Sequence, residues 1–121
     1  MEEVKMENIC LVLTILPEKS AKAREFLGAL DHDRTIEYAN SQNRIGITKE
    51  VWFISETAAS KTLIAYIETD SFNEAVGRFS ASRDPFDQWF KATLKECTGL
   101  DLNDPPALDL PEAVSIFPQK P

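Results

Sequence analysis

The sequence has few of the residues that build metal, haem and phosphate sites. Among 121 residues there are 1 histidine, 2 cysteines and 4 glycines. Cys10 and Cys97 form no CxxC motif and have no histidine at zinc-ligand spacing, so we predict no metal site. His32 falls on the outward face of a predicted helix, which disfavours haem ligation. The glycines form no phosphate-binding loop, and we predict no cofactor.

Positive charge is also scarce. The chain has 13 Lys and Arg against 20 Asp and Glu, a formal net charge of -7 and a sequence pI near 4.7. A nucleic-acid-binding protein needs a basic face for the phosphates, and anionic membrane surfaces attract the same residues. We therefore predict neither nucleic acid nor membrane as a partner.

Long apolar runs are absent too. No stretch approaches the roughly 18–20 apolar residues of a membrane span. Residues 1–16 begin with acidic residues, whereas a signal peptide begins with basic ones. Two unpaired cysteines are typical of a reducing cytosol. The sequence predicts a cytoplasmic protein of one domain.

A hairpin is the clearest element that the sequence does contain. Residues 46–55 and 62–68 are rich in β-branched and aromatic residues and flank a small polar loop. Residues 8–16 predict a further strand, with Ile9, Leu11 and Leu13 on one face and Cys10 and Val12 on the other. Because both faces of these strands carry apolar side chains, we expect both to be covered.

One long helix is predicted from residue 20 to about residues 40–43. Its apolar stripe, which includes Phe26 and Leu30, turns polar in the second half at Arg34, Glu37 and Tyr38. Two interpretations stay open. Either the helix projects past the sheet into water, or these groups line the mouth of a pocket.

Two more helices have start signals. Ser71 and Glu74 form a capping box, and Asp84-Pro85 places an N-cap carboxylate before a proline. The second helix carries an aromatic stripe and stops at Gly99. Asp87 follows Asp84 by three residues, and capping explains this carboxylate pair without an active site.

The domain is expected to span residues 1–99 and to be followed by an extended arm at residues 100–121. The arm contains five of the 7 prolines, which exclude a central strand along its whole length. Residues 114–117 are candidates for a short additional strand. The alternative is an arm that lies across a neighbouring subunit or is partly disordered.

The element order β-α-β-β-α-(α)-β predicts an α+β protein with a ferredoxin-like antiparallel sheet and helices on one face. Helices can cover only one face, although both are apolar. An exposed apolar sheet face of that size is unusual in a monomer, so we expect a homodimer in which two sheets pack together.

This pattern resembles the dimeric α+β barrel superfamily. More narrowly, residues 44–54 (RIGITKEVWFI), 84–91 (DPFDQWFK) and 98–106 (TGLDLNDPP) resemble a small bacterial family of unknown function. The superfamily resemblance implies the fold and dimerisation, and its members include cofactor-free oxygenases, haem-degrading enzymes and isomerases. It implies no catalytic residue, because none of their active-site motifs occurs here.

We therefore predict a protein that binds a small apolar or aromatic ligand between sheet and helices, and the catalytic residues stay unknown. The most specific form of this hypothesis is that the protein is a cofactor-independent oxygenase or isomerase. The alternative is a non-enzymatic module that senses a metabolite or contacts a protein. A third hypothesis is that side chains fill the cavity and the dimer is only a stable scaffold. The sequence leaves open whether the protein is an enzyme. The candidate ligand-binding residues are Arg34, Glu37, Tyr38, Trp52, Tyr66 and Trp89.

Overall fold

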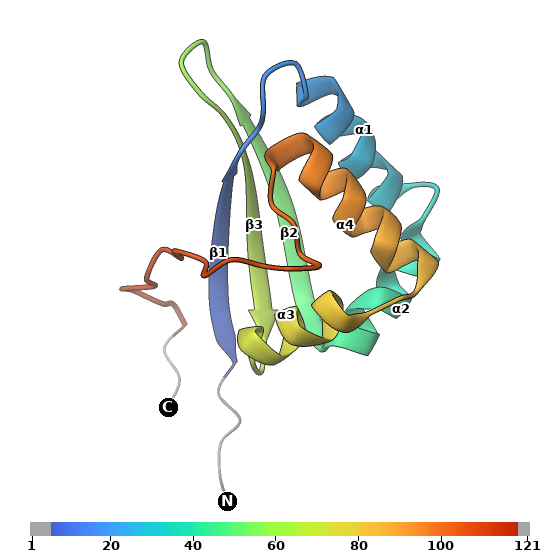
Figure 1. Cartoon of the computed structure of the whole chain (residues 1–121). Helices are drawn as coiled ribbons and strands as arrows, with labels where there is room; N and C mark the ends of the chain where they lie inside the picture. Colours follow the sequence, from blue (N-terminus) through green and yellow to red (C-terminus); the bar gives the residue numbers. More distant parts are fainter. Residues whose placement is uncertain (1–5, 119–121) are drawn as a thin grey trace, which may run out of the picture.

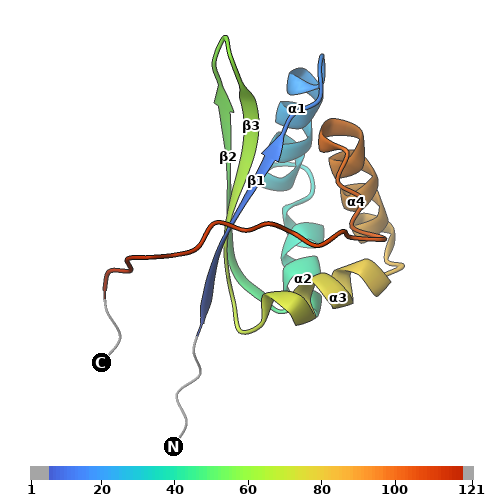
Figure 2. The same ribbon diagram turned by 60° about the vertical axis from the view of Figure 1, so that its left-hand side comes forward.

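In the described part of the chain, four helices lie on one face of a three-stranded antiparallel sheet (Figures 1 and 2). The computed structural model describes residues 6–118. The elements in chain order are β1 (Glu7–Thr14), α1 (Ser20–Asp31), α2 (Thr35–Ile45), β2 (Ile47–Glu56), β3 (Lys61–Thr69), α3 (Phe72–Ala81) and α4 (Pro85–Thr98). The predicted α+β class, the antiparallel sheet and the helices on one face are confirmed.

The sheet has the order β1-β3-β2, so that β3 lies in the middle. Ala65 at its centre pairs with Leu11 on β1 and with Trp52 on β2. These residues share the face that packs on the helices, and Ala65 and Leu63 are fully buried. The predicted hairpin is confirmed to within a residue or two at each end.

A β-bulge at the start of β2 decides which side chains face the helices. Ile47 pairs with Thr69, and Lys49 pairs with Glu68, so Thr48 is an extra residue between them. Side chains alternate along a strand, and one extra residue reverses the alternation. The bulge lets Ile47 and Glu50 both point towards the helices.

The first helical region is two helices, and the prediction of one continuous helix is wrong. α1 ends at Asp31 and α2 begins at Thr35, with a turn in which the Arg34 N–H donates to the Ala29 carbonyl at 2.8 Å. The turn contains His32 and Asp33, which are weak helix formers. The change of direction keeps Ile45, at the end of α2, in the core.

α3 and α4 follow their predicted signals. The Ser71 side chain accepts a hydrogen bond from the Glu74 N–H at 3.2 Å, and Asp84 accepts from the Phe86 N–H at 2.9 Å. Gly99 ends α4 in the left-handed conformation, with φ of 83°. These local caps fix both helices over the sheet, where their aromatic side chains form much of the core.

The second face of the sheet has no helix on it in the described chain (Figure 2). Its apolar residues include Phe53 and Val12, which are 53% and 48% exposed. The helices therefore cover one face only, as predicted. No helix among residues 6–118 is long and apolar enough to cross a bilayer.

The C-terminal arm runs from the end of α4 across β1 towards the uncovered side of the sheet (Figures 1 and 2). Leu100 and Leu102 are buried against the core, and Leu108 and Leu110 pack on it partly. From residue 111 to residue 118 every residue is exposed, and Phe117 is 95% exposed. Residues 114–117 form no strand within the described chain.

Candidate functional site

A buried carboxyl group lies between β2 and α2. Glu50 points from the inner face of β2, and Tyr38 and Gln42 approach it from successive turns of α2. The Tyr38 hydroxyl and the Gln42 amide both donate to Oε2 of Glu50, the latter at 2.9 Å. Residues four apart lie on one face of a helix, which explains how a single helix supplies both donors.

Burial sets the protonation of this group. It raises the pKa of Glu50 above the ordinary value, and the hydrogen bonds from Tyr38 and Gln42, together with the nearby Trp52 indole, oppose that rise. Burial and the nearby Glu50 charge raise the pKa of Tyr38 far above its usual range. Tyr38 therefore stays a hydrogen-bond donor at every physiological pH, while Glu50 holds its proton more tightly than an exposed glutamate does.

Trp52 completes the cluster and has an unused donor. Its indole lies close enough to lower the pKa of both Glu50 and Tyr38, yet Nε1 completes a hydrogen bond to neither. Nε1 is the only buried side-chain nitrogen or oxygen without a partner in the described part of the chain. A buried unpaired donor costs about 1–3 kcal/mol, so a ligand that pairs with it gains that energy.

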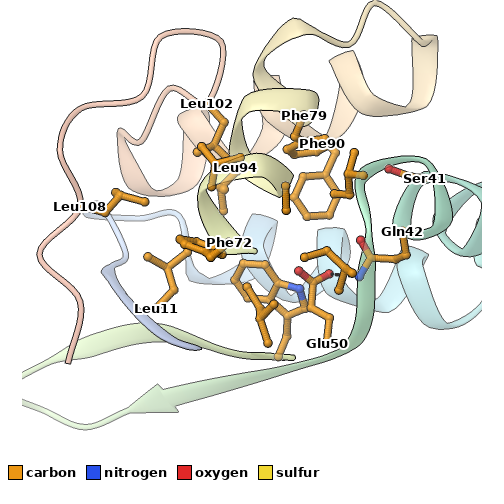
Figure 3. A pocket seen from close by; sticks show the side chains of 16 residues that line it. Leu11, Ser41, Gln42, Glu50, Phe72, Phe79, Phe90, Leu94, Leu102 and Leu108 are labelled. Carbon is orange, nitrogen blue, oxygen red and sulfur yellow. Dashed lines mark hydrogen bonds between the residues drawn. The ribbon is translucent and has the colours of Figure 1, made fainter. Parts of the chain in front are cut away.

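The cluster separates two hollows. On one side is a small, mostly apolar pocket of about 50 Å³ between sheet, α2, α3, α4 and the arm. Figure 3 shows Gln42 and Glu50 at one end of this cavity and Leu11 and Leu108 at the other. It has room for a few water molecules and for no larger ligand.

On the other side is an open cleft of about 530 Å³ between α1 and β2. Small-molecule sites usually have volumes of ~300–1,000 Å³. Leu27, Leu30 and Ile54 provide apolar walls, and Arg24 and Asp31 provide charge. Glu50 and Trp52 line both hollows. The remaining residues of the cleft are Gly28, Tyr38 and Val51.

The six predicted site residues lie in three places. Tyr38 and Trp52 come together at the cleft. The guanidinium of Arg34 stacks on the Trp89 ring, 4.1 Å from its centroid, and an Arg34 nitrogen lies 3.6 Å from a Glu37 carboxylate oxygen. These three residues do not line the cleft.

Tyr66 lies on the opposite face of the sheet from the cleft. Its hydroxyl is 2.7 Å from a side-chain oxygen of Asn8 and from one of Glu68. The hydrogen bond to Glu68 raises the pKa of Tyr66, with a smaller contribution from burial. The pair resembles Tyr38 and Glu50 chemically, but its environment is largely solvent.

Sequence reasoning missed Glu50 and Gln42. Glu50 has the same strand phase as Trp52 and Ile54, so a charged residue occurs where the pattern calls for an apolar one. That mismatch is the signal that could have identified it. Gln42 carries no comparable signal, because its role depends on the position of α2 over β2.

A second buried cluster joins α2, α3 and α4. Asp87 is 0% exposed and accepts hydrogen bonds from the Ser41 hydroxyl, the Ser82 hydroxyl and, at 3.0 Å, the Arg44 guanidinium. Asp84 is a helix cap as predicted, whereas Asp87 binds the neighbouring helices. All three donors are paired with the same carboxylate, so this cluster has the character of a structural link.

Lys91 is a second structural link, between α4 and the end of α3. Its buried ammonium donates to the carbonyls of Phe79 at 2.7 Å, Ser82 at 3.0 Å and Ser80 at 3.2 Å. A positive charge there stabilises the carbonyl end of the helix. Burial lowers the pKa of Lys91, and the charges of Asp87 and Asp101 oppose that effect.

The described residues contain no group of three or more metal-ligating side chains. No family model matches the chain, and neither a curated protein nor a solved structure was found to match it. The case for a function therefore depends on the geometry of the cleft.

Proposed function

We propose that this protein binds a small molecule in the cleft between α1 and β2. The unpaired indole N–H of Trp52 beside the Glu50 carboxyl group carries the proposal. A purely structural cluster gains by pairing all its buried donors, as the Asp87 cluster does. Trp52 lines the large cleft, and a donor kept unpaired on such a residue fits a ligand oxygen.

The cleft walls indicate the chemistry of the ligand. Leu27, Leu30 and Ile54 favour an apolar or aromatic body, and Trp52 favours at least one hydrogen-bond acceptor. The net charge of -7 disfavours strongly anionic ligands. A neutral apolar molecule with a carbonyl or hydroxyl group meets these conditions.

The protein acts as a homodimer in this proposal, with a second copy against the uncovered face of the sheet. That face presents the apolar side chains of Cys10, Val12, Val51, Phe53, Ile64 and Tyr66. The end of the described arm lies on the same side of the sheet (Figure 2), and residues 111–118 include the exposed apolar side chains of Val114, Ile116 and Phe117. Burying these groups between two copies gains ~25 cal/mol per Å² of apolar surface.

The order β1-β3-β2 is compatible with the predicted ferredoxin-like fold, which would have a fourth strand beside β1. A dimeric α+β barrel is the assembly proposed here. Metabolite sensing or protein contact without catalysis stays the alternative. No residue or contact in the cleft specifically favours the oxygenase hypothesis.

Two glycines allow a matched test of the cleft. A Cβ added to Gly28, which lines the cleft, or to Gly77, which is exposed on α3, meets nothing within 4 Å. Gly28→Leu should fill the cleft, and Gly77→Leu is the control. Both changes replace glycine in a helix, so neither should weaken folding.

The experiment is mass spectrometry of small molecules retained during gentle purification, with the Trp52 indole N–H signal followed by NMR when the retained compounds are added back. We expect retention and a Trp52 shift in the wild type and in Gly77→Leu, and loss of both in Gly28→Leu. Equal retention by both variants, or no retention by the wild type, would contradict the proposal.

A further inference from the structure

We propose that Glu50 transfers protons to and from a carbonyl ligand held in the cleft and thereby interconverts its keto and enol forms. This inference rests on the proposed ligand binding and adds a reaction to it. The reaction needs no metal, oxidant or cofactor.

The hydrogen bonds of Glu50 leave one of its oxygens free for a ligand. Tyr38 and Gln42 both donate to Oε2, and among the described residues the Trp52 indole is the one further donor near the carboxyl group, where it completes no hydrogen bond. A general base needs this arrangement, in which one oxygen is held in place and the other has a lone pair directed at the proton. Glu50 lines the cleft, which opens to solvent.

Trp52 supplies the complementary group. When a carbon next to a carbonyl loses a proton, negative charge develops on the carbonyl oxygen. An N–H donor in a water-poor site stabilises that charge strongly. Nε1 of Trp52 is covered and unpaired, and Trp52 lines the cleft, so in this proposal the indole rotates to present its N–H to a ligand oxygen.

The step balances within the ligand and the protein. Oε1 of Glu50 takes the proton from the carbon, the C–H electron pair forms a C=C bond, and the C=O electrons move to the oxygen. The carboxylic acid of Glu50 then returns the proton either to that oxygen or to a carbon. Glu50 ends in its starting form, and the product is an isomer of the ligand.

The protonation of Glu50 supports this role. Burial raises its pKa, which brings its proton affinity closer to neutral pH than that of an exposed glutamate. General acid–base catalysis is most effective when the pKa lies near the working pH. Tyr38, Trp52 and Gln42 oppose the rise, so the carboxylate form remains accessible.

The experiment uses two neutral ketones as probes, benzylacetone and cyclohexanone. NMR in D2O measures the exchange of hydrogen for deuterium next to the carbonyl, and the Trp52 indole signal measures binding. Glu50→Gln should lower the exchange rate by about 100-fold or more and keep the Trp52 shift. Glu68→Gln, which alters the similar pair on the opposite face, should keep both.

The pH profile separates catalysis from structural support. Exchange should rise with pH as Glu50 loses its proton. Tyr38→Phe should move the midpoint of that rise to higher pH, because the Tyr38 hydrogen bond lowers the pKa of Glu50. A merely structural Tyr38 would leave the midpoint unchanged.

The outcomes distinguish the two proposals. If the ketones shift Trp52 but their exchange matches buffer or is unchanged in Glu50→Gln, proton transfer is refuted and ligand binding stands. If neither ketone shifts Trp52 or exchanges faster, both the reaction and a cleft for neutral carbonyl ligands are refuted.

Discussion

Replacing Asp87 with alanine should cost about 3–5 kcal/mol of unfolding free energy, the usual effect of removing one partner from a buried ionic cluster. Asp87 is 0% exposed, and its carboxylate takes hydrogen bonds from Ser41, Ser82 and Arg44. Arg44 already lies 3.2 Å from Asp84 and keeps that ion pair, but the buried Ser41 hydroxyl has no second partner of this kind. An unpaired buried hydroxyl accounts for ~1–3 kcal/mol of the loss.

The matched control is Asp84→Ala, three residues earlier on the same helix turn. Asp84 is a partly exposed N-cap, so its loss should cost about 1 kcal/mol. Urea denaturation followed by circular dichroism measures both values, provided that the denaturant slope stays constant.

A double-mutant cycle between Asp87→Ala and Ser41→Ala tests the assigned hydrogen bond. We expect a coupling energy within ~0.5–3 kcal/mol, as for other residues in direct contact. The reasoning is wrong if Asp87→Ala costs no more than Asp84→Ala, or if the cycle shows no coupling.

Three further outcomes are expected. Lys91→Met should lower the unfolding free energy by about 2–4 kcal/mol in urea titrations, because three carbonyls at the end of α3 lose a charged donor. The raised pKa of Glu50 stabilises the fold fully below the unfolded-state pKa, and this contribution is lost as pH rises through the folded-state pKa. Wild-type stability should therefore fall across that window by up to ~1.4 kcal/mol per pH unit relative to Glu50→Gln, as measured by urea titrations at several pH values. Phe53→Lys, or truncation after Leu110, should convert a dimer into monomers in sedimentation at micromolar concentration, and an unchanged dimer would place the interface elsewhere.

Local signals made much of the fold predictable. The hairpin follows from strand alternation, and α3 and α4 begin at Ser71 and Asp84 because those side chains cap the helices through neighbouring residues. Such interactions join residues only a few positions apart in the chain. They can therefore be predicted from the sequence without knowledge of the tertiary structure.

The parts that could not be predicted depend on contacts between distant residues. The turn at residues 32–34 changes the direction of α2. This turn is stabilised because it lets Ile45 pack in the core, a contact with residues distant in the sequence. Glu50 meets Tyr38 and Gln42 only after α2 packs on β2. Helical phase placed Arg34 with Tyr38 because it assumed one straight helix, and the turn sends Arg34 to Trp89 instead.

The extra residue Thr48 in β2 determines which side chains of this strand line the cleft and which lie on the uncovered face of the sheet. Deleting this one residue while keeping Ile47 in the core would exchange the two sides of β2. Glu50 and Trp52 would then turn outwards, and Val51 and Phe53 would enter the space beside α1. A single codon thus determines at once which side chains a ligand would meet and which ones a second subunit would meet.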